Sequence, residues 1–169
     1  SLGYNAPNIE VKIKNIDNLN VDLLIEIDRG NQTKISKINF IGNSKFKSKR
    51  LKDVIVSEED KFWKFLTKNT NLNENIIGLD KRLLTNFYKS SGFYDVKVTS
   101  SIAEIKQDGS AELSYSINEG LRYSINKIST KIDKVFDNEI FFPLNKVFND
   151  YIGDYYSPFK VKKLLDEID

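Results

Sequence analysis

The sequence predicts an α+β protein made of tandem repeats, each with the element order β-α-α-β-β. The first observation is a repeat: Gly30 and Gly120 lie 90 positions apart, and so do Ile35 and Ile125. The second is that apolar residues between these marks follow strand periodicity, then helix periodicity, then strand periodicity again. Such a unit forms a three-stranded mixed sheet packed on two helices. A period of 90 exceeds the roughly 20 to 50 residues of a solenoid unit and fits a small domain.

The repeat divides the chain into one complete unit and two partial ones. Residues 31–120 form the complete repeat. Residues 1–30 correspond to the C-terminal hairpin of a preceding repeat, and residues 121–169 to the N-terminal part of a following repeat. We expect neither partial unit to contain a complete core.

The first partial unit reads as a β-hairpin. Apolar and polar residues alternate over 9–13 and again over 21–27, and a short polar turn separates the two runs. The residues that follow are too few for a free tether, so we expect them to form an inter-domain joint, comprising Arg29, Gly30 and Asn31.

The complete repeat opens with a strand over 35–41, followed by a short helix that Ser48 is expected to cap. An irregular stretch over 57–71 comes next and contains an aromatic cluster. Such clusters are typically core beneath a long loop, and the alternative is an exposed anchor loop for a partner. The anchor candidates are Phe62, Trp63 and Phe65.

The second half of the repeat is a long helix followed by a hairpin. Asn73 is expected to cap the helix and Gly92 to end it. A strand over 94–105 and another over 111–117 flank the pair Asp108-Gly109, which is a strong hairpin signal.

The last partial unit starts the pattern again. We expect a strand over 123–128, a helix over 144–151 with Pro143 in its first turn, and a second helix that Ser157 caps and Pro158 begins. A second inter-domain joint precedes it, and we expect both joints to hold neighbouring repeats close while letting them pivot. Its residues are Glu119, Gly120 and Leu121.

Composition excludes several classes of function. The chain has no histidine and no cysteine, which removes the commonest metal ligands and thiol chemistry, so we expect no metal site. Neither glycine-rich nucleotide motif occurs. The net charge is +2 with both signs interspersed, and no basic stripe indicates nucleic acid. No apolar run is long enough to span a membrane as a helix.

Carboxylates offer only a weak case for catalysis. The compact run Glu58-Glu59-Asp60 is interpreted as a solvated turn rather than a cation site, since it lacks the alternating oxygens of a calcium loop. A pair of Asp80 with Asp53 or Glu74 is the nearest alternative, and helical solvation explains those residues more simply. The residues therefore favour a binding or scaffold protein over an enzyme.

Several strings resemble POTRA (polypeptide-transport-associated) domains. Residues 38–43 (INFIGN) resemble the end of the family's first strand, 84–93 (LTNFYKSSGF) its helix end, and 117–123 (INEGLRY) its junction between repeats. Residues 61–66 and 78–84 are similar to the third repeat of outer-membrane β-barrel assembly factors. The order and spacing of these strings, which extend over nearly the whole chain, carry the resemblance.

The resemblance implies a periplasmic scaffold of an outer-membrane protein, without active site or cofactor. Its usable chemistry is the unpaired backbone of an edge strand, which can accept a partner strand by β-augmentation. Implied partners are unfolded outer-membrane β-barrel precursors, assembly-machinery lipoproteins and a C-terminal membrane β-barrel of the same protein, with no nucleic acid. The implied edge residues are Val96, Lys97, Val98, Thr99, Ser100 and Ser101.

Alternatives stay open at this point. The edge can equally be an ordinary one protected by Lys97 and by its twist. POTRA repeats also occur in two-partner secretion transporters, which normally carry two, and in division proteins, which carry one. A surface hydrolase is the alternative from a different class, and the missing histidine disfavours it.

Overall fold

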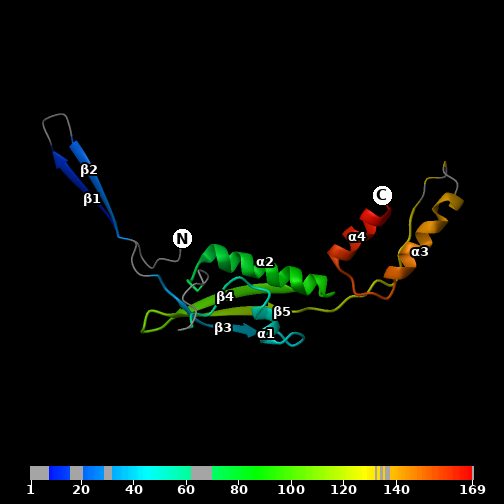
Figure 1. Cartoon of the computed structure of the whole chain (residues 1–169), viewed down its shortest axis with the longest axis horizontal. Helices are drawn as coiled ribbons and strands as arrows, with labels where there is room; N and C mark the ends of the chain where they lie inside the picture. The colour runs from blue at the N-terminus through cyan, green and yellow to red at the C-terminus, as the bar shows by residue number, and fades with distance from the viewer. Residues whose placement is uncertain are drawn as a thin grey trace.

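The computed structural model describes residues 8–15, 21–28, 32–61, 70–131, 133, 135 and 138–168. Figure 1 shows a hairpin near one end of the molecule, a central sheet with its helices, and two further helices at the other end. The elements are β1 (Asn8–Asn15), β2 (Val21–Asp28), β3 (Ile35–Ile41), α1 (Ser48–Lys52), α2 (Glu74–Ser90), β4 (Lys97–Ile105), β5 (Ala111–Asn118), η1 (Asn138–Phe141), α3 (Phe142–Tyr151) and α4 (Pro158–Ile168).

The two hairpins have the same strand register at positions 90 residues apart. In the first, β1 pairs with β2 so that Val11 lies opposite Ile25. In the second, 90 positions further on, Ser101 of β4 lies opposite Tyr115 of β5. The hairpin predicted from alternation in the first 30 residues is therefore confirmed.

The β1–β2 hairpin buries none of its described apolar side chains. Their exposed fractions run from 53% to 66%. This agrees with the expectation that the first partial unit lacks a complete core. The side chains concerned are Ile9, Val11, Ile13, Val21, Leu23, Leu24, Ile25 and Ile27.

The central sheet has the order β3-β5-β4, with β5 in the middle. Strand β3 is parallel to β5, and β4 is antiparallel to it, so the sheet is mixed as predicted. Helix α2 runs along one face of this sheet (Figure 1). The buried core lies between them and comprises Ile35, Ile38, Leu51, Ile55, Leu84, Tyr88, Phe93, Val96, Leu113, Tyr115 and Ile117.

Capping residues set the ends of α2 as the sequence predicts. The Asn73 side chain accepts a hydrogen bond from the backbone N–H of Asn75 at 2.9 Å, and Gly92 takes a positive φ of 95° after the helix. The prediction for α1 is wrong by one residue. Lys47 is its N-cap and makes no side-chain capping bond, so Ser48 is the first helical residue instead.

The strand predicted over 123–128 does not form. Its backbone bonds instead to the turn between α3 and α4: the N–H of Ile125 donates to Asp154, and the N–H of Gly153 donates to Ile125, both at 2.8 Å. Only an isolated bridge, between Ser124 and Tyr155, remains. A strand needs a neighbouring strand, and the described residues supply none beside this segment.

The two helices predicted at the C-terminal end are confirmed. Helix α3 has a proline in its first turn, and α4 begins at Pro158, as the sequence indicates. A small core joins the two helices through Phe148, Tyr151 and Leu164. Among the described residues, no helix is both long and apolar enough to cross a bilayer.

Candidate functional site: the outer edge of strand β4

Strand β4 is an edge strand of the central sheet, paired on one side only. Eight of its nine residues pair with β5. The register shifts between Val98 and Ser100, which leaves Thr99 as the extra residue of a β-bulge. Bulges twist edge strands and restrict pairing with another chain. The uninterrupted part of the edge is therefore the stretch from Ser100 to Ile105.

The hairpin turn defines which backbone groups of β4 point away from β5. The N–H of Lys106 donates to the carbonyl of Ser110 at 2.7 Å, so these two residues form a hydrogen-bonded pair. Opposed residues in an antiparallel ladder alternate between bonded and non-bonded pairs. Counting back from the turn, the residues whose backbone N–H and C=O groups point away from β5 are Ile105, Ala103 and Ser101.

These outward backbone groups are unpaired within the described part of the chain. Its backbone hydrogen bonds outside the strands and helices include none to Ser101, Ala103 or Ile105. Each such residue presents one donor and one acceptor along the edge. The arrangement can accept an added strand through main-chain hydrogen bonds, largely independent of the guest's side chains.

The edge residues predicted from the sequence begin too early in the chain, before the start of β4. Strand β4 begins at Lys97, not at Tyr94. The prediction of Val96 as an edge residue is wrong. Val96 lies outside the strand, is only 5% exposed, and donates its N–H to the carbonyl of Phe93. Lys97, Val98, Thr99, Ser100 and Ser101 do lie in β4.

Ala103 and Ile105 were missed, although the sequence contained the signal that finds them. The Asp108-Gly109 turn fixes the hairpin, and Gly109 has the positive φ of 77° that this turn requires. Counting alternate residues back from the turn gives the outward set. The sequence does not reveal the bulge at Thr99, which interrupts the alternation.

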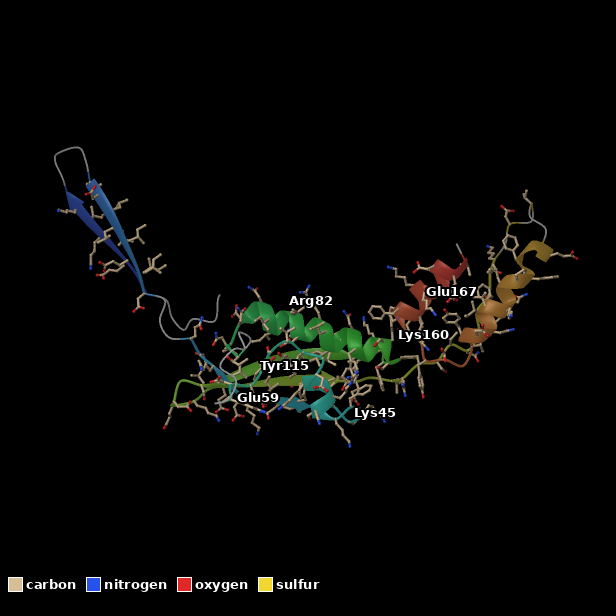
Figure 2. All side chains as sticks on the ribbon, in the orientation of Figure 1. Lys45, Glu59, Arg82, Tyr115, Lys160 and Glu167 are labelled. Atoms are coloured by element: carbon tan, nitrogen blue, oxygen red, sulfur yellow. The ribbon has the colours of Figure 1, made fainter. Side chains whose placement is uncertain are left out.

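The opposite edge of the sheet, β3, is occupied by the protein itself. Ile35 donates its N–H to Thr70 and accepts from the N–H of Asp60, both at 2.7 Å. The Glu59 carboxylate accepts the N–H of Ile38 at 3.0 Å. Figure 2 shows Glu59 beside the central sheet. Its position contradicts the prediction that 58–60 is a solvated turn.

The Glu59 carboxylate is held in its charged form. Burial alone would raise its pKa, but hydrogen bonds from Lys52 and from the Ile38 N–H outweigh this and lower the pKa below the ordinary 4.5. Lys52 also forms a direct ion pair with it. Glu59 therefore acts as a side-chain cap on the β3 edge.

Asp80 has a structural role rather than a catalytic one. It is fully buried, and its carboxylate accepts the N–H of Val56 at 2.7 Å and the hydroxyl of Tyr115 at 2.6 Å. Burial, and then the bond to Asp80, raise the pKa of Tyr115. Solvation on the helix surface is thus the wrong explanation for Asp80, because its protein donors replace water.

Glu119, predicted as a joint residue, is built into the core of the central unit. Its buried carboxylate accepts from the Ser44 hydroxyl at 2.5 Å, the Lys45 N–H at 2.9 Å and the Tyr88 hydroxyl at 3.0 Å. Burial would raise its pKa, but these bonds hold it below 4.5. The next residue, Gly120, is exposed and has a φ of 67°.

Contacts across the second joint tie the central unit to the C-terminal helices. The Arg122 guanidinium lies over the Tyr155 ring, 3.2 Å from its centroid, and over the Phe93 ring at 5.4 Å. The N–H of Tyr123 donates to the carbonyl of Gly92 at 2.9 Å. These contacts favour one orientation, and the predicted pivot stays a prediction.

The anchor-loop residues Phe62, Trp63 and Phe65 lie outside the described residues, as do the joint residues Arg29, Gly30 and Asn31. Within the described ranges, no three or more carboxylates gather in a way that could hold a metal ion.

Comparison with known proteins identifies the family. Residues 33–120 match the POTRA family model, described as a surface antigen variable number repeat. That match covers just over half of the chain. The chain belongs to the POTRA family. The POTRA model starts shortly before β3 and ends shortly after β5, so it spans the whole central sheet.

The relatives of this POTRA chain include outer-membrane assembly factors, which confirms the resemblance drawn from its sequence. It is 27% identical over 99% of its length to the outer membrane protein assembly factor BamA of Neisseria meningitidis. It is 29% identical over 75% of its length to BamA of Neorickettsia risticii. The chain spans about a fifth of the length of these curated relatives, 21% and 17% respectively.

A solved POTRA structure confirms the fold. The crystal structure of Haemophilus influenzae BamA POTRA3-5 superposes with a TM-score of 0.55 and 16% sequence identity, covering 99% of this chain and 63% of that one. The α+β class with a mixed sheet is therefore confirmed.

Proposed function

We propose that this POTRA chain is part of the periplasmic scaffold of an outer-membrane protein assembly factor. In this role it binds partners and helps β-barrel proteins to fold and insert, without catalysis. The similarity to assembly factors named BamA, which extends over nearly the whole chain, supports this role. The proposed division is the C-terminal hairpin of a preceding repeat over 1–30, a complete repeat over 31–120 and the N-terminal part of a following repeat over 121–169.

Binding occurs by β-augmentation at the outer edge of β4. The observation that carries this proposal is the row of unpaired backbone groups at Ser101, Ala103 and Ile105, beside a β3 edge that the protein closes itself. Main-chain bonding suits a scaffold that handles many different clients, because it makes little demand on side chains.

Unfolded outer-membrane β-barrel precursors are the proposed clients of this edge. A transmembrane barrel strand has about 9 to 11 residues, so part of one such strand would pair along the uninterrupted stretch of β4 from Ser100 to Ile105. Assembly-machinery lipoproteins and the membrane β-barrel of the same protein are the other proposed partners. Nucleic acid is not among them.

Replacing Ala103 by proline tests the proposal. The substitution removes an N–H that faces away from β5, so the ladder within the sheet keeps its hydrogen bonds. We expect the variant to fold, as judged by circular dichroism and thermal melting. We expect its affinity for a fluorescent ten-residue barrel-strand peptide to fall about fivefold, which corresponds to the loss of one net hydrogen bond of about 1 kcal/mol.

Two controls isolate the backbone effect. Ala103→Ser keeps the N–H and should bind the peptide as the parent does. Ile102→Pro removes an N–H that faces β5, and should destabilise the sheet instead of acting on binding alone. A folded Ala103→Pro variant with unchanged peptide affinity would overturn β-augmentation at this edge.

A further inference from the structure

The charge of this chain is unevenly distributed around the first half of the central unit. Residues 29–52 contain no aspartate or glutamate, although the chain has 24 of them. The same stretch has eight basic residues, against a net charge of only +2 for the whole chain. These are Arg29, Lys34, Lys37, Lys45, Lys47, Lys49, Arg50 and Lys52.

The loop between β3 and α1 holds part of this stretch in a fixed shape. Phe46 packs edge-on against Phe87 and Tyr88, with ring centroids 4.7 and 5.0 Å apart. Leu51 is completely buried, and the Asn43 side chain donates to the carbonyl of Phe46 at 2.9 Å. Because these residues point inward, the basic residues between them are forced outward.

Four cations are presented on this loop and on the first turn of α1, without a carboxylate to neutralise them at close range. Lys45, Lys47, Lys49 and Arg50 are all exposed, and no carboxylate of the described residues lies within 4 Å of their charged groups. Lys52, by contrast, is paired with Glu59. Figure 2 shows Lys45 at the α1 end of the central unit. We call Lys45, Lys47, Lys49 and Arg50 the basic loop.

We propose that the basic loop binds an anionic phospholipid surface. Three of its four cations are lysines, which act as point charges and fit a fluid layer of headgroups without bidentate geometry. Ile41, at the entrance to the loop, is 59% exposed and supplies an apolar side chain for the headgroup boundary. An apolar side chain beside four cations matches the headgroup boundary of a bilayer, where charged and apolar contacts occur together, and this favours a lipid surface as the occupant.

Vesicle binding by the full chain tests this proposal. The parent is compared with the triple variant Lys45→Gln, Lys47→Gln, Lys49→Gln on vesicles of phosphatidylethanolamine with phosphatidylglycerol. Each basic residue near an anionic surface contributes about fivefold, so we expect the triple variant to bind roughly 100-fold more weakly. Binding of the parent should fall steeply as salt is added, and vesicles of phosphatidylcholine alone should not bind.

A matched variant separates the basic loop from net charge. Lys127→Gln, Lys146→Gln, Lys162→Gln makes the same change in charge at three exposed lysines elsewhere, and should retain vesicle binding. Equal losses in the two triple variants would overturn the proposal. So would a parent that ignores the anionic vesicles at low salt, or one that binds poly-L-glutamate through the basic loop in their place.

Discussion

The two edges of the central sheet differ in whether their outward backbone groups are hydrogen-bonded. Along β3, the protein supplies its own partners: Ile35 bonds to Thr70 and Asp60, and the Ile38 N–H bonds to the Glu59 carboxylate. Along β4, the outward groups from Ser101 to Ile105 have no such partner among the described residues. An unpaired edge is a hazard for aggregation, and natural proteins usually blunt it. The difference supports the proposal that a partner strand binds at the β4 edge.

Closure of the β3 edge depends on side chains that come from α2 and from the loop before it. Asp80 of α2 holds the backbone at Val56 and Ser57, and that segment leads directly into Glu59 and Asp60. One buried carboxylate thus positions the segment that covers β3. Among the described residues, the β4 edge is shielded at one end by the bulge at Thr99.

The largest expected effect follows from removing Asp80. Asp80→Ala leaves the N–H groups of Val56 and Ser57 and the hydroxyl of Tyr115 without their acceptor, and each buried donor left unsatisfied costs about 1 to 3 kcal/mol. We expect the free energy of unfolding to fall by about 3 kcal/mol in urea titrations. Asp53→Ala removes an exposed carboxylate nearby and should cost under about 0.5 kcal/mol. Similar losses in both variants would show that Asp80 does not fasten the covering segment.

Substitutions at two glycines, one at the end of each edge strand, test how closely the backbone packs there. At the end of β3, a Cβ on Gly42 would lie 2.2 Å from the carbonyl oxygen of Ile117, and its φ is +84°. At the β4 turn, Gly109 has a φ of +77° with nothing within 4 Å of a Cβ. Gly109→Ala should cost about 1 kcal/mol for its backbone conformation, and Gly42→Ala about 2 to 3 kcal/mol, since it adds a clash with backbone. Equal losses in thermal melts would contradict the close approach at Gly42.

Local signals in the sequence predicted most of the central unit. Alternation located β3 and β5, Asn73 located the start of α2, and Asp108-Gly109 located the turn. These features depend on residues close in sequence, so a single chain reveals them. The contacts that close β3 join residues about 20 to 35 positions apart, such as Ile38 with Glu59. No periodicity reports such contacts, so the sequence alone predicts solvated carboxylates at Glu59 and Asp80.

The sequence identified the correct edge strand but not the residue at which this strand begins. The family resemblance placed the second strand at the edge, and the sheet order agrees. The strand start was wrong because Val96 is apolar and fits an alternating pattern, while its actual position is in the turn that packs against the core. The net charge of +2 for the whole chain does not reveal that residues 29–52 contain basic residues and no acidic ones.

The smallest of the three effects concerns Glu59 and depends on pH. Glu59→Gln removes the ion pair with Lys52 and weakens the bond to Ile38, and we expect a loss of about 1 kcal/mol at about pH 7. The pKa of Glu59 in the folded protein lies below its ordinary 4.5. Its stabilising contribution is therefore complete above about pH 4.5 and is lost as the pH falls through the folded pKa. The difference between parent and variant should shrink accordingly in urea titrations.

A matched substitution on the open edge completes the comparison. Glu104 lies exposed on β4. Glu104→Gln should change the free energy of unfolding by under about 0.5 kcal/mol, both at about pH 7 and below about pH 4.5. Glu59→Gln should also raise the rate of hydrogen exchange at the Ile38 amide, because that N–H loses its charged acceptor while the ladder to β5 remains. If the Ile38 amide stayed as protected as in the parent, the β3 edge would be closed by backbone contacts alone, and Glu59 would not distinguish it from β4.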